Sequence, residues 1–498
     1  MPALPGSTLR CSFRRTGRGA ALAAATVAFL FVAAASAVQI SVTTLGDEDL
    51  DDGLCSLREA ILAANGDVAY HGCPAGGPAD RIELTGFPSK SVIELGAALP
   101  AIAAVVEIAG PGANDLAIDG MEAWPILEID GGAGSATVVV EGLTLTRGFG
   151  PGPFGWAGAA TVRPGDSAIF RRVRFVSNRA LNGGGALQLV SGPDDGTASA
   201  TLRSCLFEGN EALGPVGGGA IYASDGSELT VESSTFFDNS ASAESGHGGA
   251  IAIQDSALEI YRSTLSGNRA SGSGGALFAL STTTATMGLS IRIADTTITQ
   301  NSAEENEDGA GDGGGIHLRR AGTAAVVVEL ANSLVGGNID GGPEISPDVF
   351  VNVATGVSLL SGGFNLIGSN AGSEALFPAG TPNGVGDFVG SVGAPLPSML
   401  APLADNGGGL PTHLPIADST SWVVDQGKCS FAPSDQRGFV DGLSGQRAVD
   451  RPEVANRPGG DYCDIGAVET GAVEPESLVF ADGFEGGDLE AWSSSQVP

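Results

Sequence analysis

Residues 207–221 read FEGNEALGPVGGGAI, and this stretch decides the fold. Its pattern is an apolar residue three positions before Asn, Ala two positions after it, a polar loop, and a Gly pair followed by Ala or Ile. The pattern occurs five times, with the Asn residues 29 to 33 positions apart: Asn178, Asn210, Asn239, Asn268 and Asn301. A sixth Asn, Asn338, lacks the Ala and the Gly pair. A constant pattern at a varying period indicates a repeat architecture with loops of different length.

Each repeat is too short to bury an apolar face alone, and it offers two or three short strands. Stacking buries that face, with strands about 4.8 Å apart and equivalent residues above one another. The sequence therefore predicts an all-β, right-handed parallel β-helix over residues 79–360. The apolar residues would form an inner stack, the Asn side chains a buried amide ladder, and the Gly pairs tight corners.

Both ends of the array are predicted to carry caps, because the end coils of a solenoid expose apolar surface and strand edges. In residues 38–78, Ser56 and Glu59 have the spacing of a capping box for a short helix that ends at Asn65-Gly66. Residues 361–469 are expected to form a β-rich C-terminal cap. Seven short strands are predicted at residues 81–84, 92–95, 105–108, 116–118, 126–129, 138–140 and 143–145.

Residues 1–37 are predicted to be a secretory signal peptide, with four Arg, an apolar run and a small-residue cleavage site. Twin-arginine export and an uncleaved membrane anchor are the alternatives. Two disulfides, Cys55–Cys73 and Cys429–Cys463, would suit an oxidising compartment. Zinc binding is their alternative. Cys205 is expected to be a buried residue of the stack rather than a nucleophile.

The net charge of the chain is −33, which disfavours nucleic acid and anionic membranes as partners. It also disfavours a strongly anionic sugar polymer unless cations bridge the two. No integral membrane segment is expected in the mature chain. The expected state is a secreted or surface-displayed bacterial monomer, with surface glycans or other cell-surface proteins as its partners.

Three segments resemble known families. Residues 55–65, CSLREAILAAN, resemble the Cys-Ser-Leu-Arg-Glu-Ala (CSLREA) domain of bacterial secreted proteins. The Asn and Gly-Gly repeats resemble polymorphic outer membrane protein repeats and the pectate-lyase-like β-helix superfamily. Residues 400–469 resemble the choice-of-anchor Q domain, through LADNGG at 403–408, DQRG at 435–438 and DIGAVE at 464–469. These resemblances imply an exported cell-surface β-helix. Residues 470–498 form an acidic tail with a candidate sorting motif.

Two sets of residues are candidates for chemistry. Asp225 and Asp255 each lie six positions after a Gly of the pair, so a shared register would stack their carboxylates about 5 Å apart. Such a pair could serve a glycosidase or hold a cation; in the alternative interpretation each Asp bonds its own turn backbone. Asp47, Asp49, Asp51 and Asp52 are calcium candidates, with solvated loop charge as the alternative.

The four histidines, at positions 71, 247, 317 and 413, show no metal-ligand spacing and are interpreted as isolated. No active-site motif is evident, and no resident cofactor other than Ca²⁺ is expected. The favoured hypothesis is a structural, adhesive or glycan-binding protein. The alternatives are a polysaccharide lyase or glycoside hydrolase, and an autotransporter passenger, against which the absence of C-terminal amphipathic strands speaks.

Overall fold

The computed structural model describes residues 37–474, except residues 133–134, 153–155, 193–194, 216, 283–287, 304–311, 325, 342–347, 353–356, 430–432 and 441–445. The predicted signal peptide, apart from its last residue, and residues 475–498 of the predicted tail lie outside the described residues.

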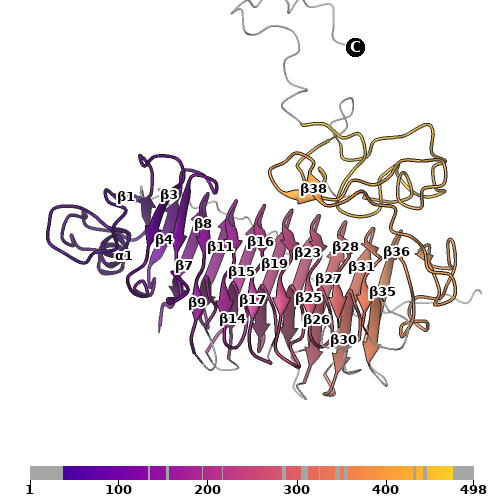
Figure 1. Cartoon of the computed structure of the whole chain (residues 1–498), viewed down its shortest axis with the longest axis horizontal. Coiled ribbons are helices and arrows are strands. Elements are labelled where there is room, and N and C mark those ends of the chain that lie inside the picture. Colours follow the sequence, from indigo (N-terminus) through magenta and orange to yellow (C-terminus); the bar gives the residue numbers. More distant parts are fainter. Residues whose placement is uncertain are drawn as a thin grey trace, which may run out of the picture. The chain divides into compact units, whose positions relative to one another are not determined.

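The described chain winds into successive coils whose strands pair in parallel, so the fold is a parallel β-helix (Figure 1). Each full coil contributes one strand to each of four sheets, which we number in their order along a full coil. Each full coil therefore contains four strands, whereas two or three were predicted. The difference arises because the two residues after each Asn also pair from coil to coil, as Glu211-Ala212 does with Ser240-Ala241.

Sheets 1 and 2 each contain 11 strands. Sheet 1 consists of β1 (Val38–Ser41), β2 (Asp80–Glu83), β4 (Val105–Ala109), β7 (Thr137–Glu141), β11 (Ser167–Arg171), β15 (Ser199–Arg203), β19 (Glu228–Glu232), β23 (Ala257–Tyr261), β27 (Leu289–Ala294), β31 (Val326–Ala331) and β35 (Val357–Gly363). Sheet 2 consists of β3 (Ser91–Glu94), β5 (Leu116–Asp119), β8 (Thr144–Thr146), β12 (Arg174–Val176), β16 (Leu206–Glu208), β20 (Thr235–Phe237), β24 (Thr264–Ser266), β28 (Thr297–Thr299), β32 (Leu334–Val335), β36 (Leu366–Ile367) and β37 (Phe388–Val389).

Sheets 3 and 4 are smaller, with 7 and 8 strands. Sheet 3 consists of β9 (Phe149–Gly150), β13 (Arg179–Ala180), β17 (Glu211–Ala212), β21 (Ser240–Ala241), β25 (Arg269–Ala270), β29 (Ser302–Ala303) and β33 (Ile339–Asp340). Sheet 4 consists of β6 (Leu127–Ile129), β10 (Ala160–Val162), β14 (Leu187–Val190), β18 (Ile221–Ser224), β22 (Ile251–Gln254), β26 (Leu277–Ser281), β30 (Ile316–Arg320) and β34 (Val349–Asn352).

The seven strands predicted before the repeats correspond to β2 through β8, with each end within one residue of its predicted position. Parallel pairing extends beyond the predicted range of residues 79–360 at both ends. It begins at β1, which pairs with β2, and it ends at β37, which pairs with β36. The segments expected to act as caps therefore also contribute strands to the coils.

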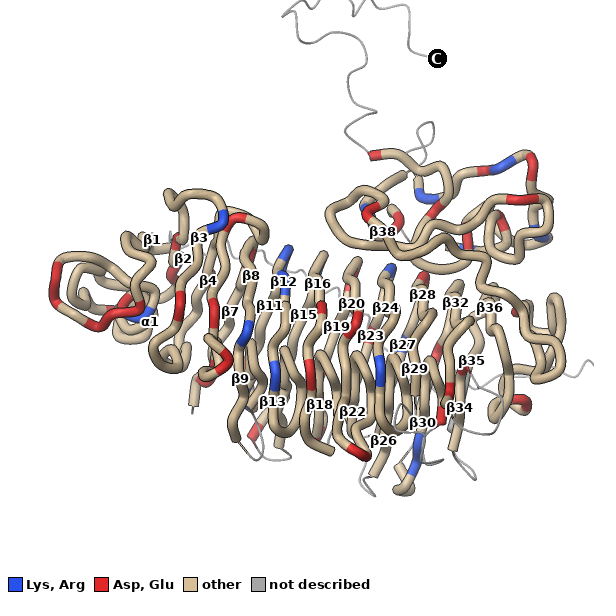
Figure 2. Tube along the Cα trace, in the orientation of Figure 1, with Lys and Arg blue, Asp and Glu red and all other residues tan. Residues whose placement is uncertain are grey.

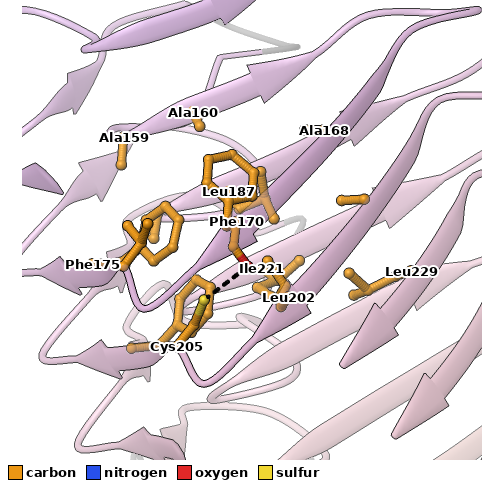
Figure 3. Packing of buried hydrophobic residues seen from close by; sticks show 14 of the residues in the cluster. Ala159, Ala160, Ala168, Phe170, Phe175, Leu187, Leu202, Cys205, Ile221 and Leu229 are labelled. Carbon is orange, nitrogen blue, oxygen red and sulfur yellow. Dashed lines mark hydrogen bonds between the residues drawn. The ribbon is translucent and has the colours of Figure 1, made fainter. Parts of the chain in front are cut away.

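The core is a column of apolar side chains that repeats from coil to coil. Phe175 and Phe207 stack with ring centroids 4.4 Å apart, and Phe207 and Phe236 with centroids 4.6 Å apart. Figure 3 shows Phe175 among buried aliphatic side chains, with Cys205 beside it. The Cys205 thiol is buried and donates a hydrogen bond to the Phe170 carbonyl, and burial raises its pKa to about 12. A thiol that remains protonated is inert.

The Asn side chains form a continuous ladder at the corner between sheets 2 and 3. Each Nδ2 donates to the Oδ1 of the next Asn at 2.8–3.0 Å, and Asn338 extends the ladder. Each Oδ1 also accepts from the backbone N–H of the preceding Asn, as Asn239 does from Asn210. The ladder ends at Asp348, whose Oδ1 accepts from Asn338. The ladder thus satisfies polar groups that would otherwise be costly to bury.

The two glycines of each pair have different roles. Gly248 adopts φ +69°, a left-handed conformation that favours glycine. At Gly249, a Cβ would lie 2.1 Å from the carbonyl oxygen of Gly275 in the next coil. In the fifth repeat, Gly313 and Gly314 are equivalent to Gly248 and Gly249. A Cβ at Gly275 would lie 2.2 Å from the carbonyl oxygen of Gly314, and Gly315 occupies the position that Ala holds in the other repeats.

Arginine side chains link neighbouring coils on the outside of the stack. Arg203 pairs with Glu232 and Arg292 with Glu329, each on adjacent strands of sheet 1. Figure 2 shows Lys and Arg positions scattered over the coils among Asp and Glu positions. Exposed pairs of this kind contribute little stability individually, about 0–1 kcal/mol each, so their main effect is to offset local negative charge.

The N-terminal cap contains α1 (Leu57–Gly66), which begins at the predicted capping box. Ser56 Oγ accepts from the Glu59 backbone, and Glu59 Oε2 accepts from the Ser56 backbone. Asp67, with φ 51°, is the left-handed C-cap, so the helix extends through the predicted end at Asn65-Gly66. Cys55 and Cys73 are paired, with a Cα–Cα distance of 4.8 Å.

Residues 397–474, the C-terminal segment, pack against the outer face of sheet 2 rather than over the end of the stack. The Ala467 backbone donates to Thr297 Oγ1, and Ser266 Oγ lies 2.9 Å from His413 Nε2. Among its described residues, strands are limited to β38 (Ala404–Asp405) and β39 (Pro411–Thr412). The expected β-rich cap is therefore mostly loop structure there, held in part by the paired Cys429 and Cys463.

Candidate functional site

The outer face of sheet 4 carries a cavity of about 590 Å³, which we call the aromatic groove. Loops between Asn and Gly-Gly form part of its wall. Its lining combines aromatic, amide and charged side chains: Arg163, Asn182, Gly183, Gln188, Val190, Pro215, Tyr222, Ser224, Asp225, His247, Ala252, Ile253, Gln254, Phe278, Leu280 and Arg319.

One outward position of sheet 4 supplies the floor of the groove. The strand register aligns Gln188, Tyr222, Ala252 and Phe278 on four successive coils. His247, from the loop before β22, stacks on Phe278 with ring centroids 4.3 Å apart and planes 16° apart. The row therefore contains two aromatic residues, Tyr222 and Phe278, which are separated by the small Ala252 and preceded by Gln188.

Ala252 lies between two larger aromatic side chains. Tyr222 and Phe278 lie two coils apart, and a coil spacing of about 4.8 Å separates their strands by roughly 10 Å. The imidazole of His247 comes from the coil of Ala252 and stacks on Phe278, so it occupies the space above Ala252. Tyr222, His247 and Phe278 therefore form one aromatic surface, which we call the aromatic floor.

Polar side chains surround the aromatic floor. Ser224, Asp225 and Gln254 line it from sheet 4 and the adjoining turn, and Gln188 Oε1 is buried without a hydrogen-bond partner among the described residues. The exposed guanidinium of Arg319 has no carboxylate within ion-pair distance in the described part of the chain, whereas Arg163 pairs with Glu128 at 2.7 Å. The groove thus offers hydrogen-bond donors and acceptors to a polar ligand.

Burial keeps the titratable rings of the groove neutral. Burial lowers the pKa of His247, and the positive charge of Arg319 lowers it further. His247 Nδ1 accepts a hydrogen bond from the Ser273 backbone at 2.9 Å, which fixes the neutral ring with its proton on Nε2. Burial also raises the pKa of Tyr222 to about 12, so its hydroxyl remains protonated and can donate.

The two candidate catalytic aspartates are neighbours in register but differ in surroundings. Both occupy left-handed turn positions, with φ 58° for Asp225 and φ 49° for Asp255. Asp255 is buried, and its carboxylate accepts from the Thr282 backbone and hydroxyl. Asp225 lines the aromatic groove. Asp225 therefore faces the groove, whereas the carboxylate of Asp255 is held by Thr282.

The four calcium candidates do not converge on one point. Asp47 pairs with Arg58 at 2.6 Å, and Asp52 accepts from the Leu54 backbone. Among the described residues, the only groups of three or more ligand side chains with atoms within 4.8 Å of one another are Asp49 with Glu59 and His71, and Glu469 with Cys429 and Cys463. The two cysteines of the second group form a disulfide.

The aromatic groove was not predicted from the sequence, although a signal exists. Its floor residues stand three positions after the second glycine of each corner, as Tyr222 does after Gly219 and Phe278 does after Gly275. The predicted pair occupies the position six after Gly, which holds Asp225. The row was missed because Ala252 and Gln188 interrupt its aromatic character.

The comparisons agree with the fold. A model of the family described as "Right handed beta helix region" matches residues 133–370. This match and the parallel sheets define a right-handed parallel β-helix, the predicted fold. No curated protein and no solved structure matches the chain. In the described part of the chain, no helix is both long and apolar enough to cross a membrane.

Proposed function

We propose that the protein is an exported cell-surface β-helix that binds neutral glycans in the aromatic groove. The observation that carries this proposal is the aromatic floor of Tyr222, His247 and Phe278, surrounded by amide, hydroxyl and carboxylate groups. Sugar rings present apolar C–H faces and polar edges, so they match an aromatic surface with a polar rim.

Charge favours a neutral ligand. The chain carries a net charge of −33, which repels polyanions over long range. Within the groove, Asp225 would accept from sugar hydroxyls and Arg319 would donate to them. A short oligosaccharide that covers the aromatic floor is expected to bind weakly, with a Kd of about 10 µM to 1 mM, corresponding to about 4–7 kcal/mol.

Export and surface display are inferred from the sequence. The predicted signal peptide, the paired cysteines and the resemblances to the CSLREA domain, the polymorphic outer membrane protein repeats and the choice-of-anchor Q domain all support them. Cell fractionation of tagged protein, with and without residues 470–498, tests this part. Retention in the cytoplasm, or intact protein embedded in the outer membrane, would contradict it.

Removing a ring of the aromatic floor tests the groove. Tyr222→Ala and Phe278→Ala each remove part of the stacking surface, and we expect each to weaken binding to neutral polysaccharides by about fivefold or more in calorimetry and pull-down assays. Tyr261→Ala, on the outer face of sheet 1, is the matched control and should bind normally. Equal binding by all three variants would exclude the aromatic floor as the glycan site.

A polysaccharide lyase or glycoside hydrolase is the alternative function. Its support is the placement of Asp225 in the groove, whereas the engagement of Asp255 by Thr282 weighs against a carboxylate pair. The test assays a polysaccharide panel with the wild-type protein and with a variant in which both aspartates are replaced by Asn. Cleavage that the double variant loses would support the enzyme; unchanged or absent activity would reject it.

A further inference from the structure

The N-terminal cap brings one imidazole and two carboxylates together, remote in sequence from the aromatic groove. His71 Nδ1 lies 3.0 Å from Glu59 Oε1 and 3.4 Å from Asp49 Oδ1. Ligand atoms of all three side chains lie within 4.8 Å of one another. We infer that Asp49, Glu59 and His71 form a binding site for a divalent transition-metal ion of the Zn²⁺ type.

The spacing of the ligand atoms fits a small tetrahedral ion. Zinc binds His nitrogen and carboxylate oxygen at about 2.0–2.2 Å, which places neighbouring ligand atoms of a tetrahedron about 3.3–3.6 Å apart. The distances of 3.0 and 3.4 Å from His71 Nδ1 are close to this value. In the metal-free protein, a proton on Nδ1 holds the same three groups together, and the ion replaces that proton.

The ligand types favour a transition metal over calcium. Imidazole nitrogen suits Zn²⁺, Ni²⁺ and Cu²⁺, whereas Ca²⁺ requires six to eight oxygen ligands. Two carboxylates and a neutral imidazole would balance the charge of a divalent ion. Figure 2 shows further acidic positions in the loop beside α1, which add negative potential. This negative potential offsets the partial positive charge at the N-terminal end of α1, where Glu59 lies.

Neighbouring groups hold the ligands in place. Glu59 Oε1 accepts from the Leu50 backbone and Glu59 Oε2 from the Ser56 backbone, each at 2.9 Å. The Tyr70 hydroxyl donates a hydrogen bond to the Asp49 carboxylate, and this hydrogen bond is the main cause of the raised pKa of Tyr70. The Cys55–Cys73 disulfide closes the loop. Such outer contacts typically strengthen metal affinity about 10–100-fold.

The site is open to solvent on one side. The side chains of His71 and Asp49 are 27% and 47% exposed, whereas that of Glu59 is 2% exposed. An ion could therefore enter without unfolding of the cap. Three protein ligands leave a fourth tetrahedral position for water or for a donor group of a partner.

The test uses residues 38–498, stripped with a chelator and titrated with Zn²⁺ by calorimetry and with Co²⁺ by visible absorption. We expect one saturable site with the absorption of tetrahedral Co²⁺, unaffected by excess Ca²⁺. His71→Ala and Asp49→Asn should each lower affinity by about tenfold or more. Asp51→Asn makes the same charge change in the same loop, and it should leave affinity within about twofold.

Two results would overturn the assignment. One is the absence of saturable Zn²⁺ binding by the wild-type protein. The other is an equal loss of affinity in Asp49→Asn and Asp51→Asn, which would indicate diffuse attraction by the acidic loop. Thermal melts in chelator establish that each variant is folded. If His71→Ala fails to fold, Asp49→Asn decides the question, because that side chain is exposed.

Discussion

The coils of the stack and the C-terminal segment bury polar side chains in opposite ways. In the stack, each Asn is neutral and bonds an identical Asn in the next coil. In the C-terminal segment, the fully buried Arg447 lies 2.9 Å from Asp295 and 3.6 Å from Glu469, with Asp464 also nearby. In a repeat, each buried amide finds its hydrogen-bond partner in the same residue of the next coil. The C-terminal segment occurs once, and its buried carboxylates are instead paired with a cation.

The ends of the ladders show the same logic. The Asn ladder ends at Asp348, and a second, shorter series through Ser333 and Asn365 ends at the buried Asp387. An Asn at the end would have an amide N–H without an acceptor, whereas a carboxylate only accepts. Burial raises the pKa of Asp348 to about 6, which is the cost of placing an ionisable group there.

The largest expected effect comes from breaking the charge network. Arg447→Met should destabilise docking of the C-terminal segment by about 3–5 kcal/mol, because Asp295 and Glu469 would then be buried without their cation. Hydrogen exchange should accelerate in residues 397–474 and remain unchanged in β7 through β14, which lie away from the segment. Arg319→Met, at an exposed site, should change neither region. Unchanged exchange in Arg447→Met would show that the network does not hold the segment.

Breaking the amide ladder should have a somewhat smaller but wider effect. Asn239→Ala removes donors to Phe207 O and Asn268 Oδ1 and the acceptor for two groups of Asn210. We expect a loss of about 2–4 kcal/mol in chemical denaturation, because buried partners are left unsatisfied. Exchange should accelerate in the coils on both sides of the mutation. The exposed Asn456 provides the control, and equal losses in Asn239→Ala and Asn456→Ala would contradict the ladder's role.

The smallest effect separates the two regions by pH. Burial raises the pKa of Asp425 to about 7 and that of Asp464 to about 6, and it raises the pKa of Glu469 well above its ordinary value. Because the unfolded chain releases these protons more readily, their contribution to stability falls as pH rises from about 4 to 7.

Hydrogen exchange at pH 5.5 and pH 8, corrected for intrinsic rates, measures this difference. The C-terminal segment should be more protected at pH 5.5, by the equivalent of about 1–3 kcal/mol. The coils that contain Asn210, Asn239 and Asn268 should show little change, because amides do not titrate. Equal protection of the segment at the two pH values would indicate that its carboxylates are stabilised as anions.

Much of the fold could be predicted because each repeat signals its own structure. Phe207 and Phe236 lie in register because their repeats share one pattern, and the seven early strands were recognisable from local apolar runs. The strands of sheet 3 were missed because they contain two residues each. The placement of the C-terminal segment was missed because its contacts with sheet 2 follow no repeated pattern. They combine hydroxyl groups with an apolar cluster in which Leu334, Leu366 and Phe388 meet Val423 and Ile465.

The candidate sites were harder to predict than the fold. Asp225 and Asp255 do occupy neighbouring positions, but Thr282, which lies outside the repeated pattern, engages one of them. His71 was interpreted as an isolated residue because its partners lie at spacings that match no linear motif. The Cys55–Cys73 disulfide and the cap of α1 bring the three groups together. Both could be predicted from the sequence, but neither indicates that His71 contacts Asp49 and Glu59.

The sequence by itself determined the repeat, its register and the identity of the residues inside the coils, because stacking places like residues above like and only a self-complementary pattern satisfies this. The tertiary structure alone decided which outward side chains meet. The aromatic floor of Tyr222, His247 and Phe278 depends on pairing across three coils, and the position of Arg447 beside Asp295 depends on how a non-repeating segment docks. Such contacts join residues distant in sequence, and no local periodicity encodes them.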